Sequence, residues 1–91
     1  MKPQKPTPGD LCVWWIPQVP MEPFWVPVQN LQEAMLLLRT LADYDRFQFE
    51  NNIKPDYSNT GGLVVWEAVG ENGEWTEWED EEGRQIDELL P

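Results

Sequence analysis

The sequence predicts a small α+β domain in which one main helix packs on an antiparallel sheet of four to five strands. Short apolar runs rich in β-branched and aromatic residues alternate with turns rich in Pro, Asn and Gly, which is typical of strands. A single segment carries apolar residues at helical spacing. With 91 residues, 41% of them hydrophobic, the chain can bury one core and no second one. The predicted element order is β-β-α-β-β.

The first ten residues differ in composition from the rest of the chain. Pro3, Pro6 and Pro8 remove backbone donors and favour an extended coil. We therefore predict a flexible, Pro-rich lead-in at residues 1–10. Residues 11–91 are predicted to form a single α+β domain that ends in an acidic hairpin.

Two strands are predicted before the helix. Residues 11–16 form an apolar run bounded by Asp10 and Pro17. Its odd and even positions are both apolar, so both of its faces should be covered. Residues 24–28 contain Pro27, which cannot donate to a sheet ladder, so this strand is predicted at an edge.

The helix is predicted to begin after Asn30, whose side chain can cap the first turn. Glu33, three residues later, can complete a capping box. The helix is expected to continue or restart through residues 44–50. Its apolar face consists of residues spaced three and four apart, namely Leu31, Ala34, Met35, Leu38, Leu41 and Ala42.

The remainder of the chain is predicted to return to the sheet. Residues 51–62 gather turn-forming residue types and should form a loop, in which Gly61 and Gly62 make the turn before a strand at residues 63–66. The Asn72-Gly73 pair is the strongest short hairpin signal and should join that strand to residues 75–78. An optional last strand is predicted at residues 84–86.

The composition argues against an enzyme and against any cofactor. The chain has no His and a single Cys, so Ser-His and Cys-His pairs, an internal disulfide and a zinc site are all excluded. Cys12 lies in an apolar strand and is read as a small hydrophobe. No run approaches the length of a membrane span. We expect a protein of a reducing cytoplasm that does not enter the membrane.

The net charge of −11 decides which partners are compatible with the chain. It repels phosphate, so direct nucleic-acid binding is not expected despite six Trp residues. The expected partner is a protein with a basic surface, such as one that itself binds DNA or RNA.

A dense acidic segment is the first candidate binding site. We interpret it as a surface that mimics a nucleic-acid backbone and occupies the basic groove of a nucleic-acid-handling partner. The structural alternative is a solvated hairpin tip that keeps the protein soluble and blunts an edge strand. The candidate partner-binding residues are Glu74, Trp75, Glu77, Trp78, Glu79, Asp80, Glu81 and Glu82.

The tryptophans offer a second candidate surface because exposed Trp is enriched at binding hot spots. Trp14, Trp15 and Trp66 lie in apolar runs and are predicted to be buried. The other three, Trp25, Trp75 and Trp78, lie near prolines or charges and are as readily exposed as buried. A third alternative is a homodimer formed through the edge strand at residues 24–28.

The sequence also resembles a family of short acidic proteins of bacteriophages and prophages, some of which are labelled superinfection exclusion protein. The resemblance spans residues 11–88. It rests on residues 13–24, 41–45, 47–59, 61–62 and 73–75. It implies a phage-encoded, non-enzymatic protein that acts in the bacterial cytoplasm and binds a host or competing-phage component. Together with the acidic segment, it predicts inhibition or modulation of a bacterial defence or nucleic-acid-handling protein. It transfers no site residues, but it supports an alternative function as a superinfection-exclusion or assembly factor that binds through an aromatic and proline-rich surface.

Overall fold

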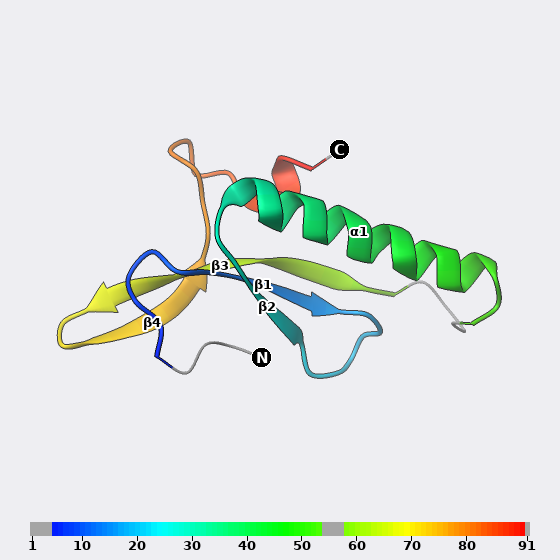
Figure 1. The fold of residues 1–91 in the computed structure, drawn as a ribbon, viewed down its shortest axis with the longest axis horizontal. Helices are drawn as coiled ribbons and strands as arrows, with labels where there is room; N and C mark the ends of the chain where they lie inside the picture. Colours follow the sequence, from blue (N-terminus) through cyan, green and yellow to red (C-terminus); the bar gives the residue numbers. More distant parts are fainter. Residues whose placement is uncertain (1–4, 54–57, 91) are drawn as a thin grey trace.

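The computed structural model describes residues 5–53 and 58–90 and shows one helix packed on a four-stranded antiparallel sheet (Figure 1). The strand order is β2-β1-β3-β4, so the first and third strands are central. The predicted α+β class is confirmed. The elements are β1 (Leu11–Ile16), β2 (Phe24–Val28), α1 (Leu31–Glu50), β3 (Thr60–Val69), β4 (Asn72–Glu77) and the 3-10 helix η1 (Ile86–Glu88).

The first two strands have the predicted bounds. β1 and β2 pair antiparallel, with Val13 opposite Val26 and Trp14 opposite Trp25. β2 lies at an edge of the sheet, as Pro27 required. β1 also pairs with β3, which places the apolar run at the centre of the sheet.

The helix starts at the predicted cap and runs without interruption through residues 44–50. The Asn30 Oδ1 accepts a hydrogen bond from the Glu33 backbone N–H at 2.8 Å. The Glu33 Oε1 in turn accepts from the Gln29 N–H at 2.8 Å, one residue before the position of a standard capping box. At the other end, the Asn51 N–H donates to the Phe47 carbonyl at 3.1 Å.

The prediction that Gly61 and Gly62 form a turn is wrong, because both residues belong to β3. They lie opposite Trp15 and Trp14 in the register with β1. A Cβ on Gly61 would overlap the Trp15 ring, and one on Gly62 would lie 2.7 Å from the Trp14 Nε1. Glycine is required here because two indoles pack directly on the strand, not because the backbone turns.

The hairpin between β3 and β4 forms, but not around Asn72-Gly73. Val69 pairs with Asn72, so the connecting residues are Gly70 and Glu71, and Gly70 adopts the left-handed φ of +61°. The optional strand at residues 84–86 is also absent from the described part of the chain. Ile86 instead begins η1 and buries its side chain to 1% exposure.

The core lies between the sheet and α1. Its buried members come from β1, α1, β3 and η1. They are Val13, Trp15, Ala34, Leu38, Leu63 and Ile86. Of the three tryptophans predicted to be buried, only Trp15 is, at 7% exposure, while Trp14 and Trp66 are half-buried. Their position explains the difference, because they lie on the face of the sheet that α1 does not cover. No helix in the described ranges is both long enough and apolar enough to cross a bilayer.

Candidate binding surface on the open face of the sheet

Four tryptophans share one face of the sheet. Side chains alternate along a strand, so Trp14 and Trp25, which are directly opposite, point to the same side. The next pair, Trp66 and Trp75, is directly opposite across β3 and β4. The register of β1 with β3 puts Trp14 opposite Gly62, four residues before Trp66, so both pairs lie on one side.

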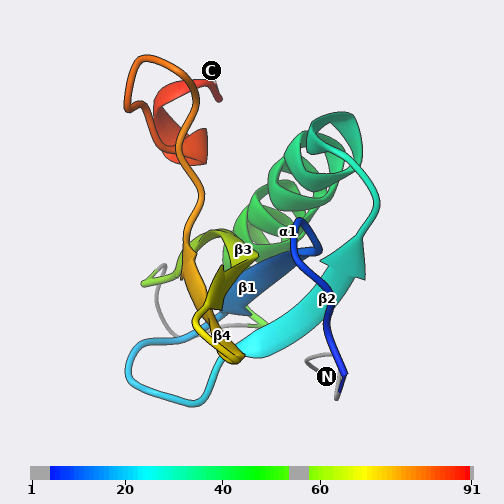
Figure 2. The ribbon, with the colours of Figure 1, turned by 90° about the vertical axis from the view of Figure 1, so that its left-hand side faces the viewer.

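This side faces away from the helix. Figure 2 shows α1 on one face of the sheet and, among the described residues, no helix on the other. We call the second side the open face and its four indoles, Trp14, Trp25, Trp66 and Trp75, the tryptophan face. All four side chains are half-buried.

Glycines let the indoles lie against the strands. A Cβ on Gly73 would overlap the Trp66 indole, just as one on Gly62 would overlap Trp14. The rings of Trp66 and Trp75 meet edge to face, with centroids 5.3 Å apart and an interplanar angle of 72°. Cys12 and Val64 share this face, yet they are 0% and 9% exposed. The indoles therefore cover their own strands.

The N-terminal segment borders the tryptophan face. The Gly9 N–H donates to the Trp66 carbonyl and the Trp66 N–H donates to the Asp10 carbonyl, both at 2.9 Å. Pro6 and Pro8 then form one wall of a hollow of about 440 Å³, with Trp66 and Glu71 among its other lining residues. Residues 1–4 of the predicted lead-in lie outside the described residues.

The strands that form the open face carry no positively charged side chain. None of the four strands contains a Lys or Arg residue. Glu77, opposite Val64, adds a carboxylate to this side. Partial burial of its carboxyl group, and then the negative charges of Asp87 and Glu79, raise the pKa of Glu77.

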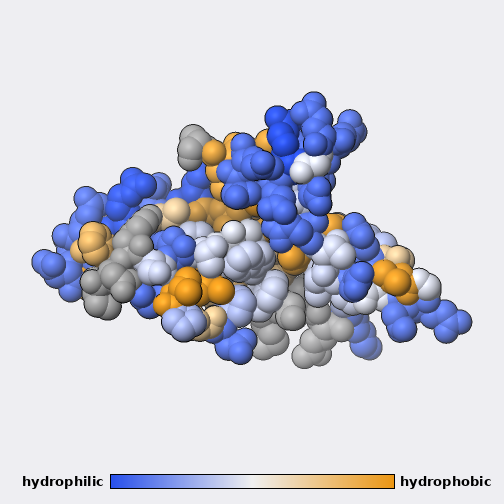
Figure 3. All heavy atoms as spheres, turned by 180° about the vertical axis from the view of Figure 1, so that it is seen from behind, coloured by the Kyte–Doolittle hydropathy of each residue, from blue (hydrophilic) through white to orange (hydrophobic). Residues whose placement is uncertain are grey.

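The acidic segment is distributed over three places. Glu74 lies directly opposite Glu67 on the side of the sheet that faces α1, whereas Glu77 belongs to the open face. The remaining four carboxylates occupy the turn at residues 79–83, which projects beyond the sheet. In Figure 3 this turn is strongly hydrophilic.

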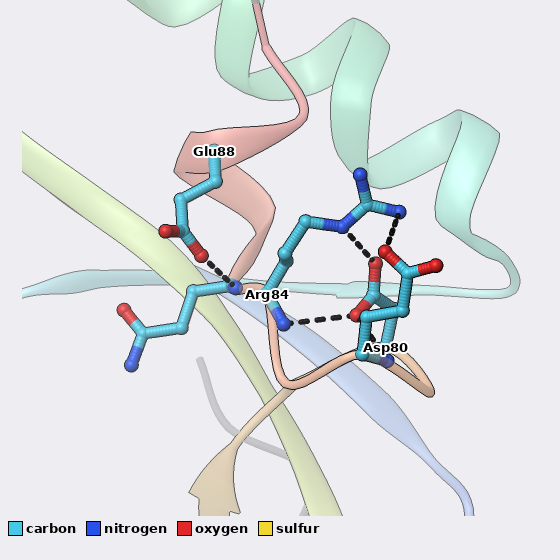
Figure 4. Close-up of polar contacts among 5 residues, drawn as sticks. Asp80, Arg84 and Glu88 are labelled. Atoms are coloured by element: carbon cyan, nitrogen blue, oxygen red, sulfur yellow. Dashed lines mark hydrogen bonds and ion pairs between the residues drawn. The ribbon is translucent and has the colours of Figure 1, made fainter.

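Asp80 organises that turn (Figure 4). Its Oδ1 accepts from the backbone N–H groups of Glu82 and Arg84, both at 2.9 Å, and its Oδ2 accepts from the Arg84 Nε at 2.8 Å. The backbone hydrogen bond from Arg84 is the largest of several causes that lower the pKa of Asp80. Arg84 also pairs with Glu82 at 3.4 Å, so one guanidinium offsets two of the carboxylates.

The two tryptophans of the acidic segment also separate. Trp75 joins the tryptophan face, while Trp78 packs against the core between sheet and helix. The structure therefore does not bring the eight predicted partner-binding residues together on one surface. Sequence reasoning missed Trp14 and Trp66 as surface candidates. The available signal was the glycines, because Gly62 and Gly73 leave room for large neighbours on the adjacent strands.

A larger cavity lies on the other side of the sheet. Its volume is about 510 Å³, and it opens between α1, the start of β3 and the C-terminal segment. Trp15 and Ile86 contribute apolar lining, and Arg39 and Arg46 are among the polar lining residues. Nowhere in the described ranges do three or more His, Cys, Asp or Glu side chains gather in a way that could hold a metal ion.

Beside this cavity, a buried carboxylate fixes the orientation of the Trp15 ring. Asp45 is 3% exposed. Its Oδ2 accepts from the Trp15 Nε1 and from the Asn59 Nδ2, both at 3.0 Å. Trp15 is therefore held by a polar contact as well as by packing.

Comparison with known proteins identifies the family. The family described as superinfection exclusion gene product 17 matches residues 10–90. The chain belongs to this family. It is also similar to a superinfection exclusion protein of Salmonella phage P22, with 54% identity over 57 residues. That match covers 63% of the chain and 55% of the relative, so the chain spans about half the length of this curated relative. No solved structure matches. The predicted resemblance is confirmed.

Proposed function

We propose that this protein takes part in superinfection exclusion by binding another protein through the tryptophan face, without catalysis. Membership of the superinfection exclusion family supports the biological role. The mode of action is supported by four indoles gathered on a face that no described helix covers. The chain has no His, and the thiol of Cys12, its single Cys, is fully buried, so the usual catalytic nucleophile pairs are missing.

The tryptophan face has the physical properties of a recognition surface. Trp supplies a large contact area with few rotatable bonds, and it is among the residues most enriched at hot spots. Here the indoles are further restrained by packing on Gly62 and Gly73. A surface that is ordered before binding loses little conformational entropy when a partner docks.

The test measures exclusion in cells. Trp25→Ala and Trp75→Ala alter the two edge strands, where truncation disturbs the sheet least. We expect each to raise the plating efficiency of a challenging phage on cells that express the protein, by about tenfold or more if the residue is a hot spot. Phe47→Ala is the matched control, since Phe47 is a 56% exposed aromatic residue on α1. Wild-type exclusion in both Trp variants, with folding verified by circular dichroism, would refute the proposal.

A second candidate function is inhibition of a basic, nucleic-acid-handling host protein by the acidic turn. The observation in its favour is that Glu79 and Glu81 are exposed and form no ion pair with any residue in the described part of the chain. The test is the triple variant Glu79→Gln, Glu81→Gln and Glu82→Gln. It keeps Asp80, which holds the turn, and so removes charge without removing the fold. Full exclusion by this variant would reject the acidic turn as the active surface.

A further inference from the structure

We propose that the tryptophan face takes a cationic protein segment, whose Arg or Lys side chains stack on the indoles and lie beside Glu77. The inference rests on the proposed function and names the chemical class of its partner. It selects among three occupants of this face, which are a cationic segment, a second copy of the chain and a neutral carbohydrate.

Charge complementarity favours the cation. The strands that build the face contain no Lys or Arg, so nothing on them repels a positive group. The face of an indole carries the negative part of the ring quadrupole, and Trp is the best aromatic partner for a cation. Glu77 and Glu71 form an acidic rim beside the indoles. The indoles and the acidic rim therefore attract the same kind of ligand.

The carboxylates around the face are available to such a ligand. Glu77 forms no ion pair with a described residue, and Glu71 lines the hollow beside Trp66. By contrast, Asp80 and Glu82 in the acidic turn already share Arg84. A cation brought to the open face would thus meet carboxylates without a counter-charge, and these are the groups that gain most from it.

The hollow beside Trp66 is large enough to take a long side chain. Its volume of about 440 Å³ is bordered by Pro6 and Pro8, by Trp66 and by the hairpin residues Gly70 and Glu71. The walls offer apolar surface to the aliphatic part of an Arg or Lys side chain, and Glu71 can pair with its charged end.

A second copy of the chain is a poor occupant by the same reasoning. Each copy carries a net charge of −11, so a face-to-face dimer would bring like charges together. A carbohydrate would stack on the indoles but would make no use of the acidic rim. The cationic segment is the occupant that uses both features.

The experiment titrates the full-length protein with a synthetic Arg-Gly repeat peptide and follows intrinsic Trp fluorescence at physiological salt. Trp75→Leu is the central variant because it keeps apolar bulk but removes the π face. We expect it to bind about tenfold more weakly, the order of a desolvated cation–π contact. Glu77→Gln should weaken binding severalfold. This substitution leaves the aromatic packing unchanged, so it tests the contribution of charge without altering the indoles.

The control separates the face from general charge attraction. The double variant Glu81→Gln and Glu82→Gln removes two negative charges from the turn at residues 79–83, and we expect it to bind more tightly than Trp75→Leu does. If it loses more affinity than Trp75→Leu and Glu77→Gln, attraction follows net charge and the inference is overturned.

Two further outcomes would also overturn it. The first is saturable binding of a neutral oligosaccharide with no binding of the Arg-Gly peptide. The second is a dimer in analytical ultracentrifugation that Trp75→Leu dissociates. In either case the exclusion assay still decides the proposed function separately, because loss of exclusion in Trp25→Ala and Trp75→Ala does not depend on the partner being cationic.

Discussion

The two faces of the sheet are built from the same alternating strands but are covered in different ways. On one side α1 packs over Val13, Trp15 and Leu63, and these side chains are almost fully buried. On the open face Trp14 and Trp66 cover the strands themselves by packing on glycines, and they keep part of their surface exposed. We infer that the helix-covered face provides most of the stability, and we propose that the open face serves recognition.

The largest expected difference between the faces is in how much free energy of unfolding is lost when a side chain is shortened. Leu63→Ala creates a cavity under α1 and should lower the free energy of unfolding by about 2–5 kcal/mol, because Leu63 is fully buried. Trp75→Leu keeps part of the apolar volume of a half-buried side chain and loses the edge-to-face contact with Trp66, so we expect about 0.5–1.5 kcal/mol. Urea unfolding measures both. Equal costs would show that the open face is a second core and not a binding surface.

The second comparison adds a methyl group to each face. Gly61→Ala pushes against Trp15, which is buried and hydrogen-bonded, so it should cost about 1–3 kcal/mol by overpacking. Gly73→Ala pushes against Trp66, which is half-buried and so has fewer neighbours to resist its displacement, and the cost should be smaller. Thermal unfolding of the two variants gives the order. The reverse order would mean that the open-face indoles are the more rigidly held.

A third prediction concerns the polar contact that fixes Trp15. Asp45→Ala leaves the Trp15 N–H and the Asn59 amide without this acceptor, which should cost about 1–3 kcal/mol. Asp45→Asn keeps one acceptor oxygen and should cost less. The indole N–H resonance of Trp15 should move in the alanine variant. If Asp45 fixes the ring, the penalty of Gly61→Ala should also shrink in the Asp45→Ala background, since the freed indole can move aside.

The elements were predictable where local chemistry alone defines them. The cap at Asn30, the apolar spacing of the helix and the Pro-limited edge strand at residues 24–28 all depend on near neighbours in sequence. They appear in the structure with the expected bounds. The class of the fold follows from them.

The tryptophan face was not predictable in the same way because it depends on register between strands. Gly61 and Gly62 have the composition of a turn, and only their pairing with Trp15 and Trp14 shows why glycine is needed in a strand. The acidic segment shows the opposite relation between sequence and structure. It is continuous in sequence, but strand alternation and the turn held by Asp80 divide it among different surfaces. Density of charge along a chain therefore did not predict one contiguous surface.

The smallest predicted effect is on the pH dependence of stability, which compares a carboxylate of the open face with one of the acidic turn. Partial burial, Asp87 and Glu79 raise the folded-state pKa of Glu77 above its ordinary value of 4.5. The folded protein then binds the Glu77 proton more tightly than the unfolded chain does, so the contribution of this group to stability falls as pH rises through that window. Glu77→Gln removes the ionised carboxylate and, with it, the free-energy cost of this charge in the folded protein.

We therefore expect Glu77→Gln to be slightly more stable than the wild type at pH 7, by less than about 1 kcal/mol because the side chain is largely exposed. The gain should vanish below about pH 4.5, where the carboxyl is protonated in both states. Chemical unfolding at several pH values measures the difference, and Glu81→Gln in the exposed turn is the control for general charge removal. A matching gain in the control would assign the effect to net charge, and Glu77 would then be no different from the carboxylates of the turn.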